Sequence, residues 1–246
     1  PESVPACRTF QGNVRHPTVF HPNTIFVSRN HAENHGAQAY VHTGLDARAY
    51  GPVDFSAPRE AFVFLAKAAW KVKNVRGAIR VARLAGSPID ILGGTRLNLS
   101  MGFRLTLTPR ARFHGMVDDT VKIPILRRSR GLIFPVLWPE PFGIALIESL
   151  YFGVPVFGTP YGSQPELIPE QVGCLSSDAA TLAELLQMSS QPAEPVPHAV
   201  RIANQVDPDP TDLGLEQPRP DRRNRAELLD LLHGDVHARG RWLLLV

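Results

Sequence analysis

The 246-residue sequence lacks the signals that mark several large classes of protein. Its two cysteines, Cys7 and Cys174, are widely spaced and belong to no metal-binding or redox pattern. No apolar run approaches the roughly 18 residues that a membrane-spanning helix needs. The patterns G-x-G-x-x-G, G-x-x-x-x-G-K-S/T and G-x-S-x-G are also missing. Their absence disfavours NAD binding, P-loop hydrolysis and hydrolysis by a serine nucleophile.

The composition is that of an ordinary soluble globular protein, with 43% hydrophobic and 20% charged residues. A net charge of +3 and a pI near 9.1 make the chain mildly basic. This charge suits anionic ligands such as nucleotide diphosphates, or a loose peripheral contact with a membrane surface. No basic stripe carries interleaved aromatic residues, so we expect no nucleic acid partner. The first ten residues do not resemble a signal peptide, and we expect a cytoplasmic protein, at most in contact with the inner membrane surface.

Strand-like and helical runs alternate between Ala61 and Leu186. A short strand is expected at 173–175, and the longer strand candidates are mainly apolar, at 61–66, 88–94, 111–117, 131–136 and 154–160. Continuous apolar strands that alternate with helices indicate a parallel sheet buried on both sides. The sequence therefore predicts an α/β fold, a Rossmann-like parallel sheet with helices on both faces.

The ends of several helices can be placed from single residues. Asn74 is expected to cap the helix that follows the first strand, and Gly86 to end it. A capped helix is also expected over 178–187. In the segment DDTVKIPILRRS, Pro124 is expected to begin the helix, because proline suits a first turn and not a helix interior.

Three segments of the chain differ in composition. Residues 1–50 contain one strand-to-helix pattern, NTIFVSRNHAENHG at 23–36, and residues 51–190 form the alternating region. Residues 191–246 are rich in proline and charge, which predicts an extended or mobile tail with one short helix. We therefore predict one sizeable domain between a short N-terminal remnant and a tail.

Two glutamates stand out in LWPEPFGIALIESLYFGVPVFGTPYG, at 137–162. Glu140 lies between two prolines, and a residue before proline is pushed out of the helical region, so Glu140 belongs to a loop. This loop follows the strand at 131–136 and precedes a helix that begins near Gly143 and carries Glu148. The carboxyl edge of a parallel sheet, beside a helix start, is where such folds receive phosphorylated ligands.

The spacing of these carboxylates leaves two interpretations open. A carboxylate held between prolines can bind sugar hydroxyls, and one on the following helix can accept the paired hydroxyls of a ribose. Alternatively, Glu140 only caps the helix and Glu148 pairs with an arginine. A further pair, His31 and His35, shares a helical face but lacks an evident third ligand, so we expect no metal site there.

The segment from Trp138 to Ile168 resembles the E-x7-E signature of retaining glycosyltransferases of the GT-B fold, particularly family 4. NTIFVSRNHAENHG and VHTGLD are similar to the end of the family's N-terminal domain. AFVFLAKAAWKVKNVRGAIRVA is similar to the segment that grips the donor diphosphate, and RFHGMVDDTVKIPILRRSRGLIFPV resembles the nucleotide-base strand and its successor. The resemblance covers residues 23–187, mainly the C-terminal nucleotide-sugar-binding domain, with the N-terminal domain largely absent.

The resemblance implies a role for each matching residue around the helix start. Glu140 would contact the donor sugar close to the reacting centre. The main-chain N–H groups of Phe142, Gly143 and Ile144 would face sugar and phosphate. Glu148 would hold the ribose hydroxyls.

The resemblance also implies that lysines neutralise the leaving diphosphate, whose growing charge is stabilised by fixed cations and a helix N-terminus. Lys73 takes the family's lysine position and Lys67 that of its usual arginine. Their spacing is six residues where the family has five, so Lys71 could replace either.

Glu166 is expected to brace its turn, not to contact substrate. The base would meet the main chain at Gly115, Met116 and Val117.

The resemblance implies a retaining hexosyltransferase that uses a UDP- or GDP-sugar donor and a saccharide or lipid-linked acceptor. No obligatory metal or other cofactor is expected, because lysines and helix N–H groups balance the diphosphate charge. With most of the acceptor domain missing, full activity would need a homo-oligomer or a partner chain. Two alternatives stay open: a GT-B-like nucleotide-sugar epimerase, and a non-catalytic module that only binds nucleotide-sugar.

Overall fold

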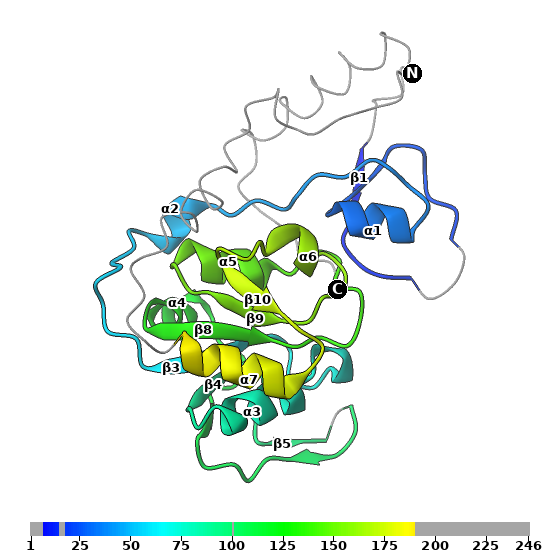
Figure 1. Ribbon diagram of the computed structural model, residues 1–246. Helices are drawn as coiled ribbons and strands as arrows, with labels where there is room; N and C mark the ends of the chain where they lie inside the picture. The colour runs from blue at the N-terminus through cyan, green and yellow to red at the C-terminus, as the bar shows by residue number, and fades with distance from the viewer. Residues whose placement is uncertain (1–6, 15–17, 100, 190–246) are drawn as a thin grey trace.

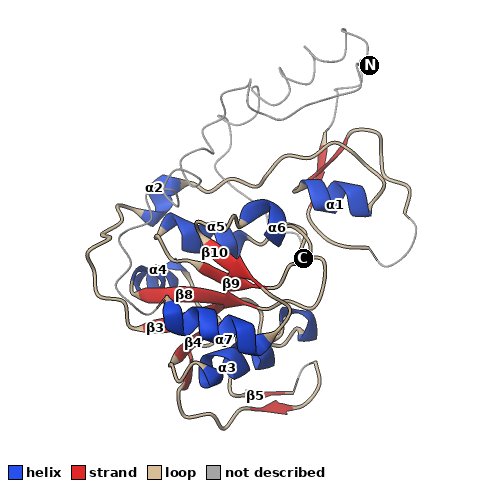
Figure 2. Ribbon diagram, in the orientation of Figure 1, coloured by secondary structure: helices blue, strands red, loops and turns tan. Residues whose placement is uncertain are grey.

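The computed structural model describes residues 7–14, 18–99 and 101–189 (Figure 1). These residues form an α/β body and a smaller N-terminal segment, whose strands and helix stand apart from the body in Figure 2. The tail predicted for residues 191–246, with its short helix, lies outside the described residues.

Six parallel strands form the sheet of the body, in the spatial order β7-β4-β3-β8-β9-β10. The order starts in the middle with β3, runs outward through β4 and β7, and then continues from β8 in the opposite direction. The strands match the predicted apolar runs, with shifted ends: β3 Ala61–Leu65, β4 Ile89–Leu92, β7 Ala111–Phe113, β8 Ser129–Phe134, β9 Val156–Gly158 and β10 Gly173–Leu175. The predicted parallel α/β fold is confirmed.

Helices cover both faces of this sheet, as predicted (Figure 1). They are α3 Val75–Leu84 and α7 Ala179–Met188 on one face, with α4 Asp119–Arg127 and α5 Ile144–Tyr151 on the other. Alternation along β3 supplies both cores, since Phe62 and Phe64 pack under α3 and α7 while Val63 packs under α4 and α5. Each fully buried side chain of this kind contributes about 1.5–3 kcal/mol.

The direction of winding reverses between β3 and β8, which are direct neighbours. In open α/β sheets, ligands bind beyond the carboxyl ends of the strands at such a reversal. Asn74 connects the loops that leave these two strands, because its Nδ2 donates a hydrogen bond of 2.8 Å to the carbonyl of Pro135. The fold therefore brings residues after β3 and residues after β8 to one place.

The N-terminal segment forms its own small parallel sheet. In it β1 (Arg8–Phe10) pairs with β2 (Thr24–Phe26), and Tyr40 adds an isolated bridge to β2. The helix α1 (Arg29–Asn34) follows β2, so the strand-to-helix pattern predicted here is confirmed.

His31 and His35 belong to an aromatic cluster with the rings of Phe10, Phe20 and Phe26. The Nε2 atom of His31 lies 2.7 Å from the carbonyl oxygen of Gly12. Burial lowers the pKa of His31, and the hydrogen bond with Gly12 opposes this change only in part. Within the described ranges, no group of three or more His, Cys, Asp or Glu side chains could hold a metal ion.

The prediction that Pro124 begins its helix is wrong. The helix α4 begins at Asp119, and Pro124 lies inside it. Asp118 caps the helix by accepting hydrogen bonds from two main-chain N–H groups of the first turn. This cap and the burial of Ile125 and Leu126 in the last turn outweigh the one hydrogen bond that proline removes.

The remaining elements are short: α2 Ala47–Tyr50, the 3-10 helix η1 Lys71–Lys73, β5 Leu97–Asn98, β6 Arg104–Leu105 and α6 Gln164–Leu167. The strands β5 and β6 form an antiparallel hairpin between β4 and β7, a connection that is usually a helix in parallel sheets. None of the helices that the structure describes is long and apolar enough to cross a membrane.

The double role of Asn74 can be tested by substitution. Asn74 has a left-handed backbone (φ 57°), its Oδ1 accepts from the Gly77 N–H at 3.0 Å, and its Nδ2 reaches Pro135. We expect Asn74→Ala to lower the free energy of unfolding in urea by about 2–3 kcal/mol, through the lost cap and backbone strain. Asn74→Gly, which tolerates the backbone, should cost about half as much.

The matched control is Asn34→Ala at an exposed position of α1, where we expect a change of at most about 0.5 kcal/mol. Equal stability of Asn74→Ala and the parent chain would contradict the assigned role.

Candidate functional site

Lys73 and Glu140 form an ion pair at the reversal point of the sheet. Lys73 comes from η1, after β3, and Glu140 from the loop after β8. The Nζ atom of Lys73 donates to both carboxylate oxygens, at 2.8 and 2.6 Å. The Lys73 and Glu140 side chains are 13% and 7% exposed. The structure thus brings together two residues that the sequence assigns to one site, although they lie 67 positions apart.

Trp138 fixes the orientation of this pair. Its Nε1 atom donates to Oε2 of Glu140 at 2.7 Å. Its ring centre lies 5.0 Å from Nζ of Lys73, and the ring of Phe134 lies 5.6 Å from the same atom. Aromatic faces attract a cation at these distances. The carboxylate and the ammonium group are therefore both held in position before any ligand is bound.

The loop that carries Glu140 is fixed from two sides. The main-chain N–H of Ser163 donates to the Glu140 carbonyl at 2.9 Å, and Gly162 (φ 67°) lies so close that a β-carbon there would overlap the Glu140 main chain. On the other side, Asn13 and Ser28 donate to the carbonyls of the two prolines that flank Glu140. The N-terminal segment thus helps to position the site.

The start of α5 lies directly after this loop. Its N-cap, Gly143, has a left-handed backbone, and the helix has no side-chain cap, so the interpretation that Glu140 caps this helix is wrong. Phe142 is buried and Ile144 is exposed. The first N–H groups of a helix have no partner within it and carry the positive end of the helix dipole. These groups can receive an anion.

Glu148 lies on α5, where the sequence places it, but its partner is not an arginine. Its Oε1 atom accepts from the Tyr50 hydroxyl at 2.7 Å and from the Lys122 ammonium at 2.5 Å. Burial, followed by the bond to Glu148, raises the pKa of Tyr50 far above its ordinary value. Burial alone would lower the pKa of Lys122, but its bonds to Asp119 and Glu148 raise it. Tyr50 therefore stays a neutral donor and Lys122 stays charged.

The other two lysines of this region are exposed. The Nζ atom of Lys67 lies 5.5 Å from the ring centre of Trp70, which packs edge-on against Trp138. The side chain of Lys71 extends beside Gly102 in the β5–β6 hairpin. Neither of these lysines pairs with Glu140, although the cation of Lys67 lies near the same loop through Trp70 and Trp138.

The loop after β7 carries the three residues assigned to the base. The Gly115 N–H donates to Gly94, and its carbonyl accepts from Gly93 and Gly94. Met116 is exposed, and Val117 is half-buried against the core under α4 and α5. The main-chain groups of Gly115 thus already bond within the protein, while Met116 faces solvent.

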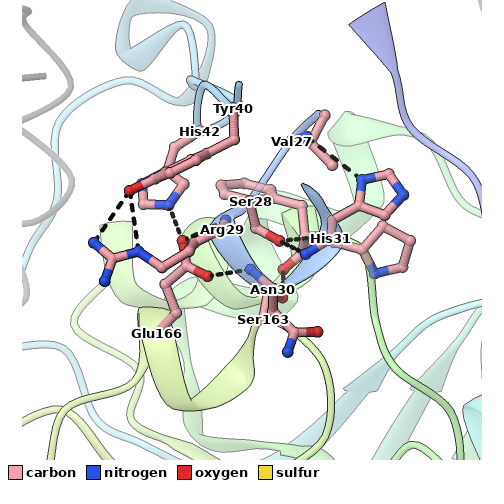
Figure 3. A network of polar contacts seen from close by, with 11 residues as sticks. Val27, Ser28, Arg29, Asn30, His31, Tyr40, His42, Ser163 and Glu166 are labelled. Atoms are coloured by element: carbon pink, nitrogen blue, oxygen red, sulfur yellow. Dashed lines mark hydrogen bonds and ion pairs between the residues drawn. The ribbon is translucent and has the colours of Figure 1, made fainter. Parts of the chain in front are cut away.

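The sequence predicts that Glu166 braces its own turn, but its carboxylate bonds instead to the N-terminal segment (Figure 3). From α6 it accepts hydrogen bonds from the main-chain N–H groups of Arg29 and Asn30 at the start of α1, at 3.0 and 3.2 Å. His42 bonds to the same carboxylate. Burial would raise the pKa of Glu166, but the bonds from His42, Arg29 and Asn30 outweigh burial and lower it.

Sequence reasoning missed three residues that contact the two glutamates: Trp138, Tyr50 and Lys122. Trp138 stands two positions before Glu140, so its presence in the same rigid loop was a usable signal. Tyr50 and Lys122 are 98 and 26 positions from Glu148, and no local pattern links them to it.

A family model with the description Glycosyl transferases group 1 matches residues 55–189, which is more than half of the chain. The matched range includes both members of the Lys73–Glu140 pair and Glu148. Among curated proteins, none matches this sequence.

Solved structures of glycosyltransferases are similar to the described fold. A glycosyltransferase involved in avilamycin A biosynthesis has a TM-score of 0.60 and 17% identity, over 80% of this chain and 61% of its own. Sucrose-phosphate synthase from Thermosynechococcus elongatus has a TM-score of 0.59 and 20% identity, over 74% and 53%. Anabaena HepE in complex with UDP-glucose has a TM-score of 0.58 and 18% identity, over 74% and 57%. The chain thus spans little more than half the length of these proteins.

The lowered pKa of Glu166 predicts a pH-dependent stability. A carboxyl group with a lowered folded-state pKa contributes stability above its unfolded pKa, about 4.3, and loses it as the pH falls through the folded value. We expect Glu166→Gln to lower the free energy of unfolding in urea by about 1–3 kcal/mol at pH 7. The difference from the parent chain should shrink below about pH 4.

The control is Glu33→Gln, which changes an exposed carboxylate of the same helix α1 and should leave stability unchanged at both pH values. A difference for Glu166→Gln that is constant with pH would show that the carboxylate charge is not what braces α1.

Proposed function

We propose a function that is based on the family of this chain. The protein belongs to the glycosyl transferases group 1. Its body has the fold of a GT-B glycosyltransferase domain. In our proposal it moves a sugar from a nucleotide diphosphate sugar to an acceptor, and the described body is the half that binds the donor.

One observation carries this proposal, the ion pair of Lys73 and Glu140 beyond the carboxyl ends of β3 and β8. An ammonium group suits the diphosphate of a donor, and a carboxylate suits the hydroxyls of its sugar. When a donor binds, the ion pair opens. Lys73 then binds the diphosphate, and Glu140 accepts hydrogen bonds from the sugar hydroxyls. Until then, the pair neutralises two charges that would be costly to leave buried and alone.

In the proposed reaction, the bond between the anomeric carbon and the diphosphate oxygen breaks, and its electron pair stays on the diphosphate. The oxygen of an acceptor hydroxyl bonds to the anomeric carbon, and the proton of that hydroxyl passes to the leaving diphosphate. The growing negative charge is stabilised by Lys73, by Lys67 and by the N–H groups of residues 142–144 at the start of α5. Retention of configuration, transfer of a hexosyl group and membership of family 4 are parts of the proposal that rest on the E-x7-E resemblance.

The nucleoside would extend along the same edge of the sheet. Both hydrogen bonds to Glu148 end on Oε1, so Oε2 is the oxygen that would meet a ribose hydroxyl. We assign the base to the loop after β7, near Met116 and Val117. The strand order supports this assignment, because β4 and β7 lie on one side of β3, whereas β8 lies on its other side. The base, the diphosphate and the sugar would therefore follow one another along the edge of the sheet.

The donor proposed here is a UDP- or GDP-sugar. Structures of Anabaena HepE contain UDP, or UDP-glucose, on a similar fold. We propose a saccharide or lipid-linked acceptor, a cytoplasmic site of action, and charge compensation by lysines and helix N–H groups without an obligatory metal.

A second candidate function is a nucleotide-sugar-binding module that depends on a partner for transfer. It is favoured by the extent of the match, since the chain spans 61% or less of the similar structures described above. In that case a second protomer or another chain would supply the acceptor half. Donor binding would then be retained without turnover.

Nucleotide affinity separates the roles of the paired residues. We expect Lys73→Ala to weaken UDP or GDP binding at least about tenfold in calorimetry, because the buried cation for the diphosphate is lost. Glu140→Gln should bind the nucleotide as well as the parent or better, since Lys73 is released. Lys71→Ala is the matched control, an exposed lysine of the same short helix, and should change affinity by at most about threefold. Equal losses for Lys71→Ala and Lys73→Ala would contradict the assignment.

Turnover separates the two candidate functions. If the chain is a transferase, donor hydrolysis or sugar transfer should be measurable, and Glu140→Gln should reduce it by about 100-fold or more without loss of nucleotide affinity. NMR of the product would report the anomeric configuration, and an inverted product would overturn the proposed retention. Binding without turnover by the parent chain would favour the partner-dependent module.

A further inference from the structure

The β5–β6 hairpin presents an unusual surface to solvent. Six large apolar side chains between residues 97 and 107 are exposed, and Phe103 and Leu107 reach 70% and 78%. The six are Leu97, Leu99, Met101, Phe103, Leu105 and Leu107. Figure 1 draws this hairpin at the margin of the body, beyond α3 and away from the N-terminal segment. We call these six side chains the hairpin patch.

The patch follows the alternation of the strands, but with the polarity reversed. The exposed apolar residues occupy the odd positions, whereas Arg104 and Thr106, at even positions, are buried. Leu97 stands opposite Leu105 across the hairpin, so both strands turn apolar side chains outward. An antiparallel pair on the surface of a soluble protein normally turns its polar face outward. An exposed apolar face of this kind marks an interaction site.

Two arginines, Arg104, which is buried, and Arg96, which is exposed, hold the hairpin in this orientation. Arg104 donates to the Thr106 hydroxyl and the Thr95 carbonyl, at 3.0 and 2.9 Å. Arg96 donates to the carbonyls of Thr106, Thr108 and Ala111 at 2.6–3.3 Å. Both guanidinium groups lie over the ring of Phe113. The polar side of the hairpin is bonded to the body. The exposure of the apolar side chains is therefore not the result of a loose hairpin.

The stretch of sequence that contains the patch is strongly basic. Between Glu60 and Asp118 the only acidic residue is Asp90, which is buried and pairs with Arg112 and His114. The same stretch contains ten basic residues: Lys67, Lys71, Lys73, Arg76, Arg80, Arg83, Arg96, Arg104, Arg110 and Arg112. Arg96 and Arg104 belong to the hairpin and bond inward, whereas two cations from outside it lie against the turn: Arg76 approaches the Phe103 carbonyl at 3.5 Å, and Lys71 extends beside Gly102.

We propose that the hairpin patch docks on an anionic lipid surface. Its apolar side chains enter the boundary between headgroups and acyl chains, and the neighbouring cations Lys71 and Arg76 meet the lipid phosphates. A second copy of the chain suits this face less well, because a two-fold contact would bring the same cations face to face. Five of the six side chains have no aromatic ring, so the patch offers little stacking surface to nucleic acid bases.

Docking in this way would orient the candidate site. Lys71 touches the hairpin turn and is two residues from Lys73 in the same short helix. The hairpin leaves the carboxyl end of β4, so it stands at the edge of the sheet that carries the ion pair. The site would thus face the membrane-proximal side of the protein. The docking surface itself does not depend on sugar transfer and can be tested without donor or acceptor.

The test is cosedimentation of the whole chain with two kinds of vesicle, phosphatidylcholine alone and phosphatidylcholine mixed with phosphatidylglycerol. We expect binding to the mixed vesicles only, and weaker binding as salt is raised. The double substitution Phe103→Ser and Leu107→Ser should weaken binding at least about tenfold. Arg76→Gln should weaken it about fivefold.

The matched control is Met188→Ser, at an apolar residue that is 73% exposed on α7, outside the hairpin patch. This variant should bind like the parent, and circular dichroism melting should confirm that all variants fold. If the double variant does not fold, Arg76→Gln and the salt dependence still decide the question. The proposal is overturned if the parent chain binds neither kind of vesicle. It is also overturned if the double variant and Arg76→Gln both bind the mixed vesicles as well as the parent does. A parent dimer that the double variant converts to monomer would instead assign the face to a second copy.

Discussion

The buried ion pair of Lys73 and Glu140 is the constraint on which the rest of the site depends. Its two members leave neighbouring parallel strands at the reversal of the sheet, and each would be an uncompensated buried charge without the other. The surrounding groups hold the pair in one geometry, with Trp138 bonded to the carboxylate and stacked near the ammonium group. Such a pair adds little net stability, but it holds a cation and a carboxylate at the place where the proposed donor would need both.

The site is not contained within one layer of the fold. The loop of Glu140 bonds to Asn13 and Ser28 of the N-terminal segment, and Glu166 ties α1 to the body through main-chain N–H groups. The position of the carboxylate is therefore coupled to the position of that segment. Any movement between the two parts would have to break these bonds, which makes them the place where the site and the wider protein are linked.

Most of the fold could be predicted from local pattern. Apolar strands and capped helices follow from side-chain periodicity and from single residues such as Asn74 and Asp178, whose caps form as expected. The prediction failed at Pro124, where a proline stands inside α4. The cap at Asp118 and the buried residues of the last turn decide that helix, and burial is a property of the assembled body, not of a window of sequence.

The sequence by itself determined which residue types stand at the carboxyl edge, because proline before and after Glu140 forces a loop and the spacing to Glu148 places the second carboxylate on the next helix. Only the tertiary structure decided their partners. Lys73 rather than Lys67 or Lys71 meets Glu140, and Tyr50 and Lys122 meet Glu148. Ion pairs form over a few ångströms between segments far apart in the chain, so no local pattern encodes them.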